Sequence, residues 1–358
     1  MTRFIEFLIS LLLVAVAFVV IGLFLPAKRS FSFTTETNRP MATVEDLLNG
    51  FGRFKDWNPL IRHDPHMKTS LSGPAQGVGA KFNYSSNDKT VGDGSWEIVE
   101  SVPGEKVRYR LVNESRGADK FMTFRLERTG QQNRNVKITQ QYTVNYGWDL
   151  LGRYSGLYVS RNVGDDIKRG LDKFSSFLAT IPKFDYSKDS SSYEFVDQPA
   201  QDILVVSTAS KRSNDEIMTA MNNQLAWINK VMASNGLVAS GPLRIVTNEF
   251  TGDSYGFDVV MPIRKASAPA DAPAGEKLVV AVEGPVSYDQ LPARRVAVTS
   301  YTGPAPGLAR RRDELRAWAM THGSDTTGAP YEDYVDGVSA MLNEDAKFKV
   351  YWPVKPAQ

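Results

Sequence analysis

The sequence predicts an α+β protein with one N-terminal transmembrane helix followed by two domains built on antiparallel sheets. Three observations lead to this prediction. Residues 5–25 form one apolar run. Residues 30–180 alternate polar and apolar positions in short segments and end in a long amphipathic stretch. Beyond about residue 198, the order strand, helix, strands occurs twice, which indicates an internal duplication.

Composition and charge exclude several classes of protein. The chain has 358 residues, of which 42% are apolar and 23% charged, which is typical of globular proteins long enough for two domains. A net charge of +2 gives no dominant positive field, so nucleic acid is not an expected partner. The chain contains no cysteine, which excludes disulfides, thiol nucleophiles and thiolate metal sites.

The apolar run "IEFLISLLLVAVAFVVIGLFL" at 5–25 contains one acid, Glu6, near its start. At about 1.5 Å per residue, such a helix crosses a hydrocarbon core of about 30 Å. The apolar region of a cleavable signal peptide is usually about 7–15 residues and ends in small residues, whereas this run continues into "LPAKRS". We therefore predict an uncleaved anchor in a bacterial inner membrane.

The sequence only weakly predicts on which side of the membrane the body of the chain lies. Arg3 precedes the run, and Lys28 and Arg29 follow it, so the positive-inside rule slightly favours a cytoplasmic body. N-terminal anchors with a short tail commonly leave only the tail inside. On balance, the expectation is a body on the periplasmic side.

The first body begins with a strand pattern, "SFSFTTET", and a helical stretch that Gly50 and Gly52 interrupt. Short alternating runs rich in β-branched and aromatic residues then predict one antiparallel meander. These runs are "MKTSLSG", "GAKFNYSS", "GSWEIVESV", "KVRYRLVN", "KFMTFRLER" and "VKITQQYTVNYG".

A long amphipathic helix is predicted over 152–180, because apolar residues recur there at helical spacing. A bent sheet closed by one long helix encloses an apolar cavity. Its expected walls are inward-pointing aromatic residues of the first body, although the same residues would equally fill a solid core. They are Trp57, Trp96, Tyr109, Phe124 and Tyr142. Asn58 is expected to cap a turn before Pro59 or to orient a ligand carbonyl.

A polar, serine-rich segment at 182–198 is predicted to be a linker. The second body then shows two strand–helix–strand patterns, whose helices are "SNDEIMTAMNNQLAWINKVMASNG" and "LARRRDELRAWAMTHG". Its expected strands include "DILVVSTAS", "SYGFDVVMPI", "LVVAVEG", "RRVAVTSYTG" and the final "KFKVYWPV". The segment "RKASAPADAPAGEK" between them is predicted to be a loop.

The first body, 30–181, resembles the SRPBCC superfamily in its polyketide cyclase/dehydrase-like branch. The resemblance rests on "FKDWNPL", "LSGPAQGVGAKFNY" and "GDGSWEIVES". It implies a helix-grip, START-like fold around a hydrophobic cavity that binds a lipid-like or polycyclic small molecule. The resemblance identifies no catalytic residue in this chain.

The second body, 199–358, is similar to GyrI-like effector-binding domains. The resemblance rests on "YGFDVVMPI", "LPARRVAV", "YTGP", "LRAWAMTHG", "GAPYEDY" and "VYWPV", in that order. It implies a groove between two duplicated halves, where a glutamate among aromatic residues attracts lipophilic cationic or polarised ligands. That glutamate falls on Glu332. Some relatives are hydrolases that use the same acid with a nearby tyrosine.

Glu332 stands in "GAPYEDYVDG", directly after a Gly-Ala-Pro turn. It is either a solvated loop acid or a carboxylate in a pocket, where an incoming cation would compensate its loss of water. Aromatic faces would add about 0.5–2 kcal/mol each through cation–π attraction. The candidate walls, any of which would also suit an ordinary core, are Tyr255, Phe257, Tyr301, Tyr334, Tyr351 and Trp352.

Two further patterns suggest chemistry but are better explained structurally. His63 and His66 stand three apart in "HDPH", but the chain has three histidines and this loop offers no further ligand cluster, so no metal is expected. The run Arg310–Arg312 is diluted by Asp313 and Glu314, which favours a solvated helix face over a nucleic-acid site.

Together these observations predict a membrane-anchored, non-enzymatic binder or sensor of lipophilic or cationic small molecules, with no cofactor. The alternative is an enzyme, either cyclase-like in the first body or hydrolase-like in the second. In the second case Glu332 would be the general base and Tyr301 or Tyr334 the acid. A third hypothesis is an envelope component whose pockets bind nothing.

Overall fold

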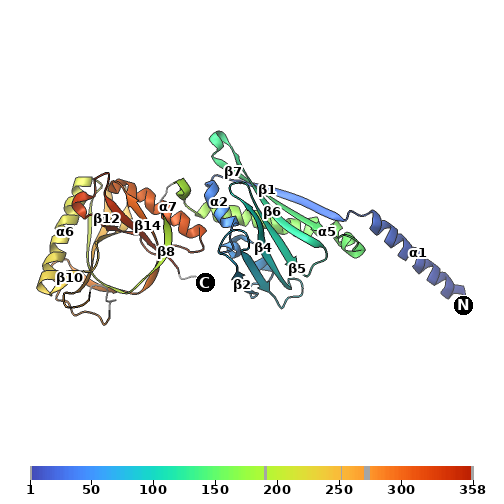
Figure 1. Cartoon of the computed structure of the whole chain (residues 1–358), viewed down its shortest axis with the longest axis horizontal. Helices are drawn as coiled ribbons and strands as arrows, with labels where there is room; N and C mark the ends of the chain where they lie inside the picture. The colour runs from blue at the N-terminus through green and yellow to red at the C-terminus, as the bar shows by residue number, and fades with distance from the viewer. Residues whose placement is uncertain (1, 189–191, 251, 270–274, 356–358) are drawn as a thin grey trace. The chain divides into compact units, whose positions relative to one another are not determined.

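A computed structural model describes residues 2–188, 192–250, 252–269 and 275–355 of the chain. It divides into two compact units, Met1–Lys183 and Phe184–Gln358, each built on one antiparallel sheet (Figure 1). The α+β class predicted from the sequence is confirmed. The apolar N-terminal helix, the long helix after the first sheet and the second sheet are all present.

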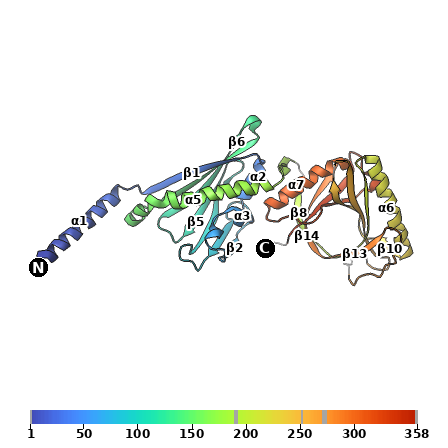
Figure 2. The same ribbon diagram turned by 180° about the vertical axis from the view of Figure 1, so that it is seen from behind.

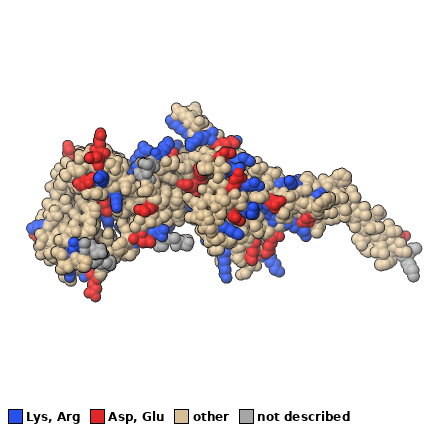
Figure 3. Space-filling view, viewed as in Figure 1, with Lys and Arg blue, Asp and Glu red and all other residues tan. Residues whose placement is uncertain are grey.

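The N-terminal run forms a single helix, α1 (Thr2–Phe24). From Arg3 to Phe24 it is long and apolar enough to cross a membrane. Its large apolar side chains are exposed around the whole helix, and its visible surface is almost free of charge (Figure 3). Within the described residues only the C-terminal end of α1 packs on protein, where the ring of Tyr154 stacks 4.3 Å from that of Phe18. The composition of the remaining surface predicts an apolar environment around the helix.

The first unit is a seven-stranded antiparallel sheet in the order β1-β7-β6-β5-β4-β3-β2, with the long helix α5 along one face (Figure 2). Its strands are β1 (Lys28–Thr37), β2 (Lys68–Ser72), β3 (Lys81–Ser85), β4 (Asp93–Val102), β5 (Lys106–Asn113), β6 (Ala118–Thr129) and β7 (Asn135–Asn145). Its helices after α1 are α2 (Met41–Leu48), α3 (Phe54–Trp57), α4 (Leu60–His63), the short 3-10 turn η1 (Gln131–Asn133) and α5 (Leu150–Thr180).

Period-two alternation places the core of the first unit between the sheet and α5. Strand β7 alternates strictly between partly exposed and buried residues, as expected for a sheet with one covered face. Asp149 caps the N-terminus of α5, since its Oδ1 accepts a hydrogen bond from the Gly152 nitrogen at 2.9 Å. Glycines let the helix approach the sheet, since a Cβ on Gly156 would lie 2.7 Å from the Tyr146 ring.

The second unit is a nine-stranded antiparallel sheet with two helices. It comprises η2 (Tyr186–Lys188), β8 (Tyr193–Gln198), β9 (Gln201–Lys211), α6 (Asn214–Ser234), β10 (Leu237–Ala239), β11 (Leu243–Phe250), β12 (Ser254–Lys265), β13 (Ser287–Leu291), β14 (Arg294–Thr302), η3 (Ala305–Gly307), α7 (Leu308–Thr321), β15 (Tyr331–Tyr334), η4 (Val338–Ala340) and β16 (Lys347–Pro353). From the junction of β11 with β15, the strand order outward is β12, β9, β13 on one side and β16, β14, β8 on the other. The unit is thus two β-α-β-β halves, β9-α6-β11-β12 and β14-α7-β15-β16.

Helices α6 and α7 cover the same face of this sheet. The α6 helix contacts β9, β10 and β12, and α7 contacts β14 and β16. Apolar residues of both helices share one core cluster with Ile245 on β11 and Val350 on β16. A second, smaller cluster around Tyr331 and Tyr351 lies on the opposite face.

The sequence-based linker at 182–198 is wrong at its end. Residues Tyr193–Gln198 form β8, an edge strand that pairs with β14. The serines before it suggested a solvated segment, but Tyr193 and Phe195 alternate and pack against the core. Of the predicted loop at 264–277, residues 270–274 lie outside the described residues.

Candidate functional site

Glu332 is a fully buried strand residue at the junction of the two halves. In β15 it lies between Ile245 of β11 and Val350 of β16 in the ladder, and its exposed fraction is 0%. Of the two alternatives that the sequence left open, the solvated loop acid is therefore wrong. The Gly-Ala-Pro turn ends just before the strand, and a four-residue strand leaves too short an alternating pattern to recognise.

Arg312 is the ionic partner of Glu332. It lies in α7, and its Nε donates a hydrogen bond to Oε1 of Glu332. The other carboxylate oxygen, Oε2, is buried and has no hydrogen-bond partner among the residues that the structure describes. One of the two carboxylate oxygens is therefore without a hydrogen bond from the described residues, which is unusual for a buried charged group.

Burial and charge act in opposite directions at this pair. Loss of water raises the pKa of the Glu332 carboxyl above its ordinary value, against the charge and hydrogen bond of Arg312. Burial also disfavours the charge of Arg312, but the negative charge of Glu332 raises the pKa of that guanidinium overall. A second cation near Oε2 would favour the ionised carboxylate further.

The raised pKa of Glu332 predicts a pH-dependent stability. The folded state holds the Glu332 proton more tightly than the unfolded state, so this group stabilises the fold most below the unfolded pKa of about 4.3. Its contribution falls as pH rises through the folded pKa. The difference in melting temperature between Glu332→Gln and the native chain should therefore shift in favour of the variant as pH rises above about 4.3. A difference that stays constant with pH would contradict this.

Three of the predicted aromatic walls lie on the same sheet face as Glu332. Tyr334 is two residues along β15, and Tyr255 and Phe257 lie on β12 with their rings stacked 4.7 Å apart. The Tyr255 hydroxyl pairs with Thr247 Oγ1 at 3.0 Å. Burial raises the pKa of both Tyr255 and Tyr334, so their hydroxyls stay neutral at physiological pH.

The other three predicted walls are placed differently. Tyr351 lies on the opposite face, stacked 4.9 Å from Tyr331. Trp352 is on the face of Glu332, and the Arg316 guanidinium lies 5.6 Å from its ring. Tyr301 packs on Phe348 and donates its hydroxyl to the Pro304 carbonyl at 3.1 Å. The Tyr301 hydroxyl therefore stabilises the turn at Pro304, while the carboxylate of Glu332 pairs with Arg312.

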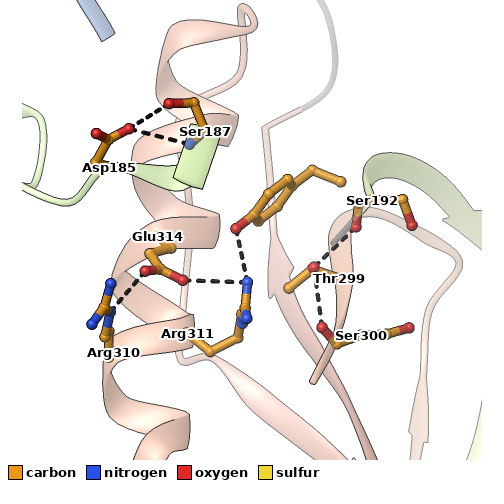
Figure 4. A network of polar contacts seen from close by, with 9 residues as sticks. Asp185, Ser187, Ser192, Thr299, Ser300, Arg310, Arg311 and Glu314 are labelled. Carbon is orange, nitrogen blue, oxygen red and sulfur yellow. Dashed lines mark hydrogen bonds and ion pairs between the residues drawn. The ribbon is translucent and has the colours of Figure 1, made fainter. Parts of the chain in front are cut away.

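The arginine run of α7 is not a solvated face, contrary to the sequence-based interpretation. Arg310 is exposed, but Arg311 and Arg312 turn toward the protein. Both Arg310 and Arg311 pair with the buried Glu314, at 2.9 and 3.3 Å, and Arg311 also donates to the Tyr193 hydroxyl at 3.0 Å (Figure 4). Arg311 thus links α7 to Tyr193 of the sheet, and Arg312 is the ionic partner of Glu332.

A second buried ion pair lies on the opposite face of the same strand. Arg244 Nε donates to Asp333 Oδ1 at 2.8 Å, and its Nη1 donates to Gln201 Oε1 at 3.1 Å. The Arg244 guanidinium lies 4.3 Å from the centre of the Tyr331 ring. Glu332 and Asp333, which are adjacent in sequence, therefore belong to separate sites on the two faces of β15.

The first unit contains a cavity of about 160 Å³ between the sheet and α5, partly open to solvent. Three of the predicted aromatic walls, Trp57, Trp96 and Tyr142, line it. The other two, Tyr109 and Phe124, are fully buried core residues and do not line it. Tyr109 instead donates its hydroxyl to the Leu48 carbonyl. The further lining residues are Asn58, Pro59, Leu60, His63, Leu111, Asn113, Ser115, Met122, Gln140, Val163, Asp166, Ile167 and Gly170.

Polar groups gather at one part of this lining. His63 Nε2 lies 3.0 Å from Asp166 Oδ2, and Asn58 Oδ1 accepts the Leu60 backbone N–H at 3.0 Å, as expected for a turn cap. Gln140 was not predicted from the sequence. The available signal was its inward position in the alternating run "VKITQQYTVNYG".

No group of three or more histidine, aspartate or glutamate side chains is placed to hold a metal ion in the described part of the chain. His66 lies in an exposed loop, where its backbone N–H bonds to Asp64 at 2.8 Å.

No protein-family model matches the chain, and no curated protein matches it. Similar solved structures include the EcmrR–DNA complex in EcmrR-RPo, determined by cryo-EM, at 14% identity over 59% of this chain and 86% of that chain, with a TM-score of 0.37. The crystal structure of the EcmrR C-terminal domain matches at 14% identity over 47% of this chain and 99% of that chain, with a TM-score of 0.37. Truncated norcoclaurine synthase from Thalictrum flavum matches at 10% identity over 42% of this chain and 93% of that chain, with a TM-score of 0.31.

Proposed function

We propose that the chain is a membrane-anchored small-molecule-binding protein. Its second unit takes lipophilic cationic ligands beside Glu332, and its first unit takes a lipid-like or polycyclic molecule in the cavity under α5. The observation that carries the proposal is the fully buried Oε2 of Glu332, for which the described part of the chain supplies no hydrogen-bond partner. A buried carboxylate oxygen without a partner is costly unless a bound group supplies one.

The surroundings of Glu332 suit such a ligand. Tyr255, Phe257 and Tyr334 offer aromatic faces on the same side of the sheet, each able to add about 0.5–2 kcal/mol of cation–π attraction. Arg312 already neutralises part of the carboxylate charge. A ligand cation therefore either joins Arg312 at the free oxygen or displaces its guanidinium, and in both cases the aromatic walls favour lipophilic cations over small hydrated ones.

The proposed location follows from α1. A helix of this length and composition would hold the chain at a bilayer, where apolar ligands are concentrated. We place the body on the periplasmic side of a bacterial inner membrane, with the short tail that contains Arg3 inside. Cysteine accessibility labelling of a single introduced cysteine in intact cells would test this side, since the natural chain has no cysteine to interfere.

A thermal-shift experiment on the full chain in detergent tests the proposed cation site. Tetraphenylphosphonium should stabilise the native second unit, by about 2.7 kcal/mol at a hundred times its Kd. Glu332→Gln should weaken its binding at least tenfold, because the amide keeps the shape of the side chain but loses the charge that attracts the cation.

Two controls accompany this experiment. Glu344→Gln removes one charge from an exposed position of the same unit and should leave the response intact. Tetraphenylborate has nearly the same shape with the opposite charge and should not distinguish native protein from Glu332→Gln. If the native chain and Glu332→Gln bind tetraphenylphosphonium with equal affinity, the proposed cation site is wrong.

A further inference from the structure

Strand β7 places a buried polar side chain, Gln140, between two larger apolar or aromatic residues on the inner face of the first sheet. Gln140 is 4% exposed, and its inward neighbours along the strand are Ile138 and Tyr142. Its side-chain oxygen, Oε1, has no hydrogen-bond partner among the described residues. An apolar residue at this position would fit the alternating pattern of the strand without leaving a hydrogen-bond acceptor unpaired.

Trp57, which lines the cavity together with Gln140, carries a second unmet polar atom. Trp57 is the last residue of α3 and is 1% exposed, with its ring 5.0 Å from Phe174 of α5. Its indole N–H is buried and has no acceptor within the described ranges. Buried tryptophan N–H groups usually find a partner, and the described residues supply none for this one.

The two atoms are complementary. Trp57 Nε1 can only donate a hydrogen bond, and Gln140 Oε1 can only accept one. Both residues line the cavity of about 160 Å³, whose other walls are mostly apolar. An apolar cavity of about 150 Å³ holds one benzene ring, so this one holds about one ring, and its open side lets a larger molecule extend outward.

We propose that the first-unit cavity binds a planar cyclic molecule that carries a hydrogen-bond acceptor next to a donor, as a cyclic amide does. Its carbonyl oxygen accepts from Trp57 Nε1, and its N–H donates to Gln140 Oε1, while its ring contacts Trp96 and Tyr142. This inference rests on the proposed binding function of the first unit and names the chemical class of its ligand. A site built in this way rejects analogues that lack one of the groups, because they leave its buried polar atoms unpaired.

Three ring compounds of similar size test the inference, titrated into the full chain in detergent by calorimetry. They are 2-quinolone, which has both groups, N-methyl-2-quinolone, which lacks the donor, and naphthalene, which has neither. We expect 2-quinolone to bind about tenfold more tightly than N-methyl-2-quinolone, which corresponds to about 1.4 kcal/mol. Naphthalene should bind more weakly than 2-quinolone.

Gln140→Met supplies the matched variant, because methionine has a similar length but cannot replace the acceptor. In this variant 2-quinolone and N-methyl-2-quinolone should bind with equal affinity, and the ligand-free protein should melt at a higher temperature than the native one. Gln141→Met is the control. Gln141 is the next residue of β7, faces outward and bonds Ser30 Oγ at 2.9 Å, so its loss should leave the tenfold preference unchanged.

The outcomes separate the inference from the proposed function. If naphthalene and both quinolones bind native protein with equal affinity, the cavity binds rings but the donor–acceptor assignment is wrong. The assignment is also wrong if Gln140→Met still binds 2-quinolone more tightly than N-methyl-2-quinolone. It is wrong, too, if Gln140→Met melts at a lower temperature than the native protein, because ordered water then already satisfies the two atoms. If none of the three compounds binds, the proposed function of the first unit itself fails. The ranking of the three probes on native protein stands even if a variant does not fold.

Discussion

Arg312→Met is expected to destabilise the second unit by about 3–5 kcal/mol at neutral pH, because it removes the ionic partner of a fully buried carboxylate. For a domain of this size, that loss lowers the melting temperature by about 6–20 °C. The loss should be smaller at low pH, where Glu332 takes up a proton and no longer needs the guanidinium. Calorimetry of the full chain in detergent at several pH values would measure both effects.

The same variant should bind tetraphenylphosphonium more tightly than the native chain. With Arg312 removed, both oxygens of Glu332 are available, and the ligand restores the missing positive charge. The double variant Arg312→Met with Glu332→Leu is the matched control, since removing both charges of a buried pair is often nearly neutral for stability. It should regain most of the lost stability and show no response to the cation. A stable single variant that ignores the cation would contradict the role given to Glu332.

The ion pair on the opposite face of β15 predicts the second large effect. Asp333→Leu leaves the guanidinium of Arg244, which is 3% exposed, without its carboxylate partner, and should cost about 3–5 kcal/mol. Arg244→Met should cost a similar amount. The double variant should lose much less than the sum, because the apolar side chains then pack against Tyr331 without a buried charge. Unfolding of the three variants followed by calorimetry gives the coupling free energy.

Cation binding should distinguish the Arg244–Asp333 ion pair from the proposed binding site at Glu332. Asp333 and Glu332 are neighbours in sequence, but their side chains point to opposite faces of the sheet. Arg244→Met with Asp333→Leu should therefore keep the native affinity for tetraphenylphosphonium. If this double variant loses the cation response while remaining folded, the ligand lies on the face of Tyr331 and Tyr351 instead.

The first-unit fold was largely predictable because its sequence signals are local. Strands β1, β3, β5 and β7 alternate over at least five residues, and α5 repeats apolar residues over eight turns, so both periods are recognisable without tertiary contacts. The cavity followed from the arrangement of sheet and helix. Which aromatic residues line it did not, because Tyr109 and Tyr142 lie on the same inward face and differ in what packs beside them.

The candidate site of the second unit was only half predictable. Resemblance pointed to Glu332, but the strand that holds it is four residues long. Arg312 was missed because three consecutive arginines look like a solvated surface. Their spacing gave a usable signal, since Arg311 and Arg312 lie three and four residues after Leu308, and Leu315 follows at the next turn, so both fall on the buried stripe of α7.

The sequence by itself determined the meander and long helix of the first unit, the two helices of the second unit, the apolar N-terminal helix and the duplicated plan of the second unit, but not the short strands β8 and β15. These depend on the periodicity of side chains along one segment, which the chain carries locally. Only the tertiary structure decided that Arg312 meets Glu332, that Asp333 faces away from it, and that Trp57 and Gln140 share one cavity. Those pairings join residues from different elements, and they depend on how strands and helices pack, because burial and partner choice are properties of the assembled core.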